Sequence, residues 1–162
     1  MSQRVRILVL VGLLVVLMGA VLGVEALRRS SAAPELVPGS IPIYVEGKLV
    51  GGFVPDDLAS VAKATFVDAE EGKNQEGWML RDVLRLHVPA RKLRPETRIV
   101  VTSSSSGKSA DLTWAEVDNP ANWVLFDLSG RGTLKLVSVL ERLDVRDEWV
   151  QDVDRIDVGG GE

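Results

Sequence analysis

The chain opens with one long apolar segment and continues into a region where short apolar runs alternate with polar ones. Residues Ile7 to Val24 are 18 consecutive positions without a charge. At about 1.5 Å per residue, a helix over this run spans roughly 27 Å, close to the ~30 Å hydrocarbon core of a bilayer. We therefore expect a transmembrane anchor over residues 1–25. A linker over 26–40, an α+β domain over 41–158 and a tail over 159–162 are expected to follow.

The charges beside the apolar run predict how the anchor is oriented. Arg4 and Arg6 precede the run, which favours a cytoplasmic N-terminus and an extracytoplasmic C-terminal domain in the cell membrane. Arg28 and Arg29 follow it and weaken this bias. A cleaved signal peptide is the alternative, but the apolar core of such a peptide has only ~7–15 residues. The length of the run therefore favours an uncleaved, single-pass anchor.

Two glycines near the end of the run form a candidate contact between membrane helices. Gly19 and Gly23 have the small-xxx-small spacing that lets two helices approach closely. The same spacing also arises by chance in apolar runs that contain several glycines. An intramembrane contact at these positions is one of two interpretations.

Beyond residue 40 the pattern predicts more strands than helices. A hairpin is expected from strands over 41–46 and 49–53, with further strands over 64–68, 98–103, 123–128 and 133–139 and near 112–114. Short helices are expected from Pro55, over 79–87 and near 115–117, and a polar loop over 70–77. The order of these elements predicts an α+β, β-rich domain with mixed or antiparallel pairing and short helices.

Composition removes several classes of function. The chain has no Cys and a single histidine, His87, so thiolate chemistry and histidine-rich metal sites are excluded. Without the charged residues that flank the apolar run, 15 basic and 22 acidic residues remain, a net charge of −7. An acidic domain argues against binding to nucleic acid, which requires a basic face. We expect no cofactor, no metal and no catalytic residue.

Residues 102–109, TSSSSGKS, match the phosphate-binding loop pattern except that Thr102 occupies the position of its first glycine. That loop must open a long helix whose N-terminus faces the phosphate. Here the following residues, ADLTW, are typical of a strand. We therefore expect a solvent-exposed hairpin turn instead of a nucleotide site.

A basic stretch surrounds His87, and it is the candidate site of the domain. As a functional site it would be an anion pocket or a face that docks an acidic partner. The alternative is a solvated surface whose charges pair with the acidic residues of 141–157, because charge runs usually pair or face water. The stretch consists of Arg81, Arg85, Arg91, Lys92, Arg94 and Arg98.

The order of short motifs along the domain resembles a known family. The motifs are GWxLxDVL (77–84), IVVTSS (99–104), ADLTW (110–114), VLFDLSG (124–130), RGTLKLV (131–137), EWV (148–150) and RIDV (155–158). This order is similar to that of the molybdopterin-binding domain of the sulfite-oxidase family in its compact form. The resemblance covers about residues 43–158 and implies the fold of that domain.

The sequence departs from the family where its chemistry is done. The family's enzymes hold molybdenum through a cysteine thiolate, and this chain has none. Thr133 and Lys135 occupy the positions of the family's Pro and Arg, the family's D-G-Y turn is replaced by SGK at 106–108, and its pterin-anchoring histidine has no counterpart. The resemblance thus implies the fold and argues against the redox reaction.

These observations lead to one functional expectation and two alternatives. We expect a membrane-anchored, non-catalytic accessory subunit that acts by protein–protein contact with an integral membrane protein or complex. The first alternative is an oxidoreductase-like domain that still binds a pterin or another anion at the basic stretch. The second is a tethered small-ligand binding subunit of a transporter.

Overall fold

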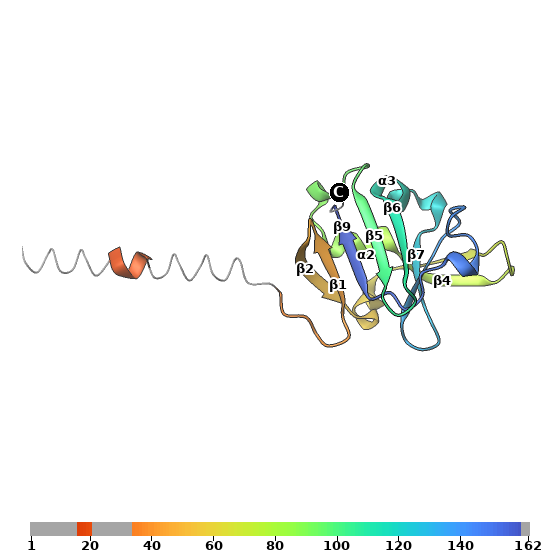
Figure 1. Ribbon diagram of the computed structural model, residues 1–162, viewed down its shortest axis with the longest axis horizontal. Helices are drawn as coiled ribbons and strands as arrows, with labels where there is room; N and C mark the ends of the chain where they lie inside the picture. The colour runs from red at the N-terminus through yellow and green to blue at the C-terminus, as the bar shows by residue number, and fades with distance from the viewer. Residues whose placement is uncertain (1–15, 21–33, 160–162) are drawn as a thin grey trace, which may run out of the picture. The chain divides into compact units, whose positions relative to one another are not determined.

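Two β-sheets and several short helices make up the described part of the domain (Figure 1). The computed structural model describes residues 16–20 and 34–159, which belong to two separate units. Residues 16–20, which include Gly19, are helical. Gly23 and the rest of the expected anchor lie outside the described residues. Among the residues that are described, no helix combines the length and apolar character needed to cross a bilayer.

The first sheet has five strands in the order β2-β1-β9-β5-β6. Strand β1 pairs in parallel with β9, and the other neighbours pair antiparallel. Strand β9 therefore joins the expected N-terminal hairpin to a second hairpin from the middle of the chain. The strands are β1 (Ile41–Val45), β2 (Lys48–Phe53), β5 (Arg98–Ser103), β6 (Lys108–Thr113) and β9 (Arg155–Val158).

The second sheet has four strands in the order β3-β4-β7-β8 and is antiparallel throughout. Its strands are β3 (Lys63–Val67), β4 (Asn74–Met79), β7 (Leu125–Leu128) and β8 (Leu134–Val137). The mixed α+β class and the β-rich content predicted from sequence are confirmed.

Short helices connect the two sheets. Helix α2 (Leu80–His87) follows β4 directly and buries Leu80, Val83 and Leu84, which share one helix face. The apolar spacing also predicts Leu86 on that face, but its side chain is exposed. Helix α3 (Trp114–Asp118) begins with a capping box, in which the Thr113 hydroxyl accepts from the Glu116 N–H and the Glu116 carboxylate accepts from the Thr113 N–H. Four 3₁₀ turns complete the described helical elements: η1 (Pro55–Ser60), η2 (Ala90–Lys92), η3 (Pro120–Asn122) and η4 (Arg146–Glu148).

The core consists of two clusters of apolar side chains. The larger draws on both sheets and on α2, with Ile43, Leu84, Phe126 and Ile156 fully buried. The smaller consists of Phe66, Met79, Leu125, Val137 and Trp149. Burial of this aliphatic and aromatic surface drives the two sheets together.

The prediction of a polar loop over 70–77 is wrong for its second half, because strand β4 begins at Asn74. Strand β4 alternates exposed and buried positions, but two of the buried positions hold Gln75 and Gly77 instead of apolar residues. Gly77 allows β4 to approach β7, because a Cβ there would lie 1.8 Å from the carbonyl oxygen of Phe126. The first half of β4 therefore alternates in burial as a strand does, but its sequence lacks the alternation of apolar and polar residues that would predict one.

Residues 34–40 belong to the same compact unit as the sheets. A turn closes this segment, with the Ser40 N–H donating to the carbonyl of Val37 at 3.0 Å. Leu36 covers Gly52 of β2 so closely that a Cβ on that glycine would lie 2.9 Å from the Leu36 Cδ2. The segment thus approaches the first sheet at the beginning of β1 (Figure 1).

Candidate functional site

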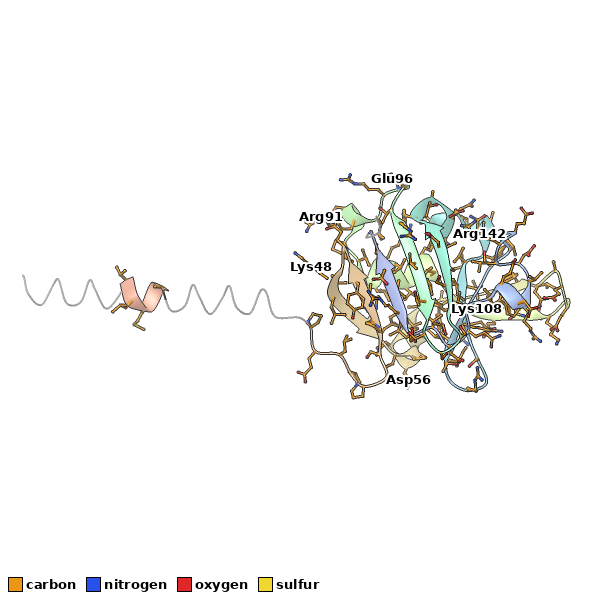
Figure 2. The ribbon with its side chains drawn as sticks, viewed as in Figure 1. Lys48, Asp56, Arg91, Glu96, Lys108 and Arg142 are labelled. Carbon is orange, nitrogen blue, oxygen red and sulfur yellow. The ribbon has the colours of Figure 1, made fainter. Side chains whose placement is uncertain are left out.

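Four of the six cations of the basic stretch come together at one pocket. Arg91, Lys92 and Arg94 line a cavity of about 510 Å³ with Arg98, the next basic residue along the chain. The carboxyl ends of the parallel strands β1 and β9 supply Val45, Glu46, Val158 and Gly159 to the same cavity, and Glu96 and Thr97 complete it. We call this cavity the basic pocket. Figure 2 shows Arg91 and Glu96 toward one end of the domain and Asp56 toward the other.

Thr97 braces the loop that presents the cations. Its hydroxyl donates to the carbonyl of Lys92 and accepts from the N–H of Arg94, each at 3.0 Å. The Thr97 carbonyl in turn accepts from the N–H of Trp114, the first residue of α3, at 2.8 Å. The loop is therefore held at both ends, and little conformational entropy remains to be lost on binding.

Backbone hydrogen bonds also join the other walls of the basic pocket. The N–H of Glu46 donates to the carbonyl of Val158 at 2.9 Å, and the N–H of Gly159 donates to the carbonyl of Arg98 at 2.8 Å. Gly159 has a φ of +59°, in the region that side chains disfavour. The ends of β1, β5 and β9 thus form a fixed floor beneath the charged rim.

The charges around the pocket are unevenly paired. Lys92 forms an ion pair with Glu46 at 2.6 Å, and Arg98 donates to both carboxylate oxygens of Asp111. The Lys92 ammonium, through its hydrogen bond and its charge, lowers the pKa of the Glu46 carboxyl below its ordinary value. Arg91 and Arg94 are exposed and form no ion pair within residues 34–159.

The other two predicted cations lie elsewhere, between α2 and α3. Arg81 donates to the backbone carbonyl of Asp118 at 3.2 Å. Arg85 forms an ion pair with the Asp118 carboxylate and lies 5.7 Å from the ring centre of Trp114. Both guanidinium groups are thus used in contacts between helices, and they do not contribute to the basic pocket.

The alternative interpretation, in which the basic stretch pairs with the acidic residues of 141–157, finds no such ion pair among the described residues. Asp152 and Asp157 bind Arg131 and Arg155 instead. The single histidine is also separate from the cations: His87 is half-buried and stacks on Phe53 with 5.6 Å between ring centres. Burial lowers the pKa of His87, and the nearby Asp57 carboxylate opposes this shift.

The serine-rich segment forms the expected hairpin turn. Strands β5 and β6 pair antiparallel up to Ser103 and Lys108, and the intervening residues 104–107 form the turn. Lys108 extends to the backbone carbonyl of Asp147. A strand follows the loop instead of a helix, so the geometry that a phosphate-binding loop requires does not form.

Lys135, which under the sulfite-oxidase resemblance would replace an arginine, is engaged by side chains of this domain. Its ammonium forms an ion pair with Asp127 at 2.8 Å, donates to the side-chain oxygen of Gln75 at 3.0 Å and lies 4.8 Å from the ring centre of Trp149. With this lysine paired and no cysteine in the sequence, these residues do not fit a molybdenum–pterin group. Within residues 34–159, no group of three His, Asp or Glu side chains is arranged to hold a metal ion.

No protein-family model matches the chain, and none of the curated proteins matches it either.

Sequence reasoning found the cations of the pocket but not its other walls. Arg91, Lys92 and Arg94 are neighbours in sequence, and a local charge count is enough to find them. Glu46 lies 46 residues from its partner Lys92, and only the parallel pairing of β1 with β9 brings Val158 beside it. Pro89 and Pro95 bracket these basic residues in the sequence, and prolines so placed indicate that the segment after α2 is a loop.

Proposed function

We propose that the protein is a membrane-anchored, non-catalytic accessory subunit whose extracytoplasmic domain binds a protein partner in the same membrane. The observation that carries the proposal is the basic pocket, a braced surface with two exposed guanidinium groups that no described carboxylate neutralises. Arginines held in this way bind carboxylates of a second molecule, because the planar guanidinium donates two parallel hydrogen bonds.

The apolar run supports an anchor for this domain. Residues Ile7 to Val24 have the length of a membrane helix, and Arg4 and Arg6 favour a cytoplasmic N-terminus. Nine residues separate Val24 from Pro34, where the compact unit begins, and such a segment extends at most about 35 Å. Tethering this short raises the effective concentration of a neighbour in the same membrane, so a modest contact suffices.

We further propose that the domain is a sulfite-oxidase-like fold that has lost the redox site. The mixed α+β architecture supports this, as does the position of the motifs on it: GWxLxDVL spans the β4–α2 junction, and RGTLKLV includes β8. The absent cysteine and the engaged Lys135 weigh against a molybdenum reaction.

A tethered subunit that binds a pterin or another small anion is the second candidate. The volume of the basic pocket supports it, since about 510 Å³ lies within the ~300–1,000 Å³ typical of small-molecule sites. Glu46 and Glu96 on the rim weigh against it, because both carboxylates repel a compact anion.

Purification of the full chain from its own membranes in mild detergent tests the accessory function. We expect a stoichiometric integral membrane partner, and we expect deletion of residues 1–33 to leave a folded domain that no longer retains it. Gly19→Leu combined with Gly23→Leu should weaken retention, whereas Val21→Leu in the same run should not. A lone monomer throughout purification would contradict the proposal.

A further inference from the structure

We infer that the basic pocket binds an extended acidic segment of the partner. Carboxylates of that segment would bind the guanidinium groups of Arg91 and Arg94, and one more would displace Glu46 from the Lys92 ammonium. This inference rests on the accessory function proposed above and adds to it the chemistry of the partner and the place where it binds. Four features of the described domain support it.

The pocket already holds one carboxylate. Glu46 projects from the turn between β1 and β2 and bonds the Lys92 ammonium at 2.6 Å. The side chain of Glu46 is 59% exposed, so it can leave Lys92 without uncovering buried surface. Glu46 therefore acts as an internal competitor that shows where a carboxylate of another chain would bind.

Two further cations have no such competitor. Arg91 and Arg94 flank Lys92 on the loop that Thr97 braces, and both guanidinium groups are exposed. Each can form two parallel hydrogen bonds to a carboxylate, the strongest geometry available to an exposed ion pair. Because the loop is already fixed, binding immobilises the arginine side chains but not the backbone.

The distribution of charge favours separated carboxylates over one compact polyanion. Glu46 and Glu96 lie among the cations that line the pocket. A phosphate or pyrophosphate placed among the arginines would also face these two carboxylates. An extended peptide distributes its single charges along the chain, so each carboxylate can meet one cation.

The rest of the domain directs an acidic segment to this pocket. Residues 41–158 carry 15 basic and 20 acidic residues, a net charge of −5, so on balance the domain repels an acidic partner. The segment 34–40 joins β1 at its beginning, whereas the pocket lies at the carboxyl end of that strand. The segment 34–40 and the pocket thus lie at opposite ends of β1.

Fluorescence anisotropy of labelled hexaglutamate, titrated with the full chain in detergent, tests the inference. We expect saturable binding that weakens with added salt, as contacts between exposed charges do. Arg91→Gln combined with Arg94→Gln should weaken binding at least about tenfold, or ~1.4 kcal/mol. Lys73→Gln combined with Arg131→Gln removes the same charge from exposed sites outside the pocket and should leave the affinity unchanged.

The variant Glu46→Gln should change the affinity for hexaglutamate in the opposite direction. Removing the internal competitor frees Lys92, so hexaglutamate should bind several-fold more tightly although the variant lies at the rim of the pocket. Three results would each overturn the inference. The first is equal affinity of the Arg91/Arg94 double variant and its control, and the second is unchanged or weaker binding by Glu46→Gln. The third is tighter binding of inorganic pyrophosphate than of hexaglutamate.

The peptide titration and the purification from membranes separate the two proposals. Arginine-dependent binding of hexaglutamate without any membrane partner would overturn the accessory function and leave the pocket assignment standing. A membrane partner that co-purifies equally well with the Arg91/Arg94 double variant would overturn the pocket assignment and leave the accessory function standing.

Discussion

Replacing Lys135 with Met should destabilise the domain far more than the same change at Lys63. Both lysines form one ion pair with a carboxylate and lie over a tryptophan, Lys135 with Asp127 and Lys63 with Glu76. The two lysines differ chiefly in burial, and Lys135 also donates a hydrogen bond to Gln75. The side chains of Lys135 and Asp127 are 18% and 16% exposed, whereas those of Lys63 and Glu76 are 51% and 57% exposed.

The expected magnitudes follow from that difference. Removing one partner of a buried pair leaves an uncompensated charge and costs about 3–5 kcal/mol. Water still reaches part of Asp127, so we expect a loss near the lower end, about 3 kcal/mol. Breaking an exposed pair costs under about 1 kcal/mol, and Lys63→Met should stay within that limit. A loss of ~3 kcal/mol lowers the ratio of folded to unfolded protein by more than about a hundredfold.

Urea unfolding of the two variants, followed by tryptophan fluorescence, measures this difference. With a slope of about 1–3 kcal/mol per molar urea, Lys135→Met should move the midpoint down by about 1–3 M. Adding Asp127→Leu to Lys135→Met should recover much of the loss, because apolar replacements of a buried pair are often neutral. Equal losses for Lys135→Met and Lys63→Met would refute the reasoning, since burial would then not decide the cost.

Three further predictions test other parts of the structure. Gly77→Ala should prevent folding or lower the melting temperature sharply, because its Cβ would overlap the carbonyl oxygen of Phe126, while Gly130→Ala, with open space around it, should change little in a thermal melt. Since burial lowers the pKa of His87 below its unfolded value of about 6.5, the unfolded chain binds the proton more readily and stability is lost as the pH falls below ~6.5. His87→Gln should therefore show a smaller drop in unfolding free energy between about pH 7.5 and about pH 5.5, and an unchanged drop would contradict this assignment. Lys108→Ala should shift stability by under about 0.5 kcal/mol, and equilibrium dialysis should detect no saturable ATP binding in either protein; binding lost in the variant would restore the nucleotide hypothesis.

Local patterns predicted much of the fold because local chemistry determines those elements. The strand over 98–103, the helix over 79–87 and the first hairpin all carry the apolar spacing or turn residues that their burial requires. The sequence places the turn of this hairpin one residue too late, at residues 47 and 48. In the structure Glu46 and Gly47 form the turn, both with positive φ, and Lys48 already belongs to β2.

Elements that depend on distant partners escaped prediction. Gln75 reads as a loop residue, yet it is buried because Asp68 and Lys135 satisfy its polar atoms. The walls of the basic pocket likewise meet only through pairing between the two ends of the domain. A hydropathy pattern records neither a hydrogen bond nor a close approach between strands, so it could identify the cations and not the cavity.

The place of β9 in the first sheet has a consequence for how the domain folds. Strand β9 comes last along the domain, yet it lies between β1 and β5 and supplies the only link between the two hairpins of that sheet in the described residues. During synthesis, neither hairpin can complete its sheet until residues 155–158 have emerged. Contacts of such long sequence separation form slowly, and until they form the unpaired edges of β1 and β5 are open to aggregation. A domain delivered across a membrane as it is made would therefore have to remain unfolded until nearly all of it had crossed.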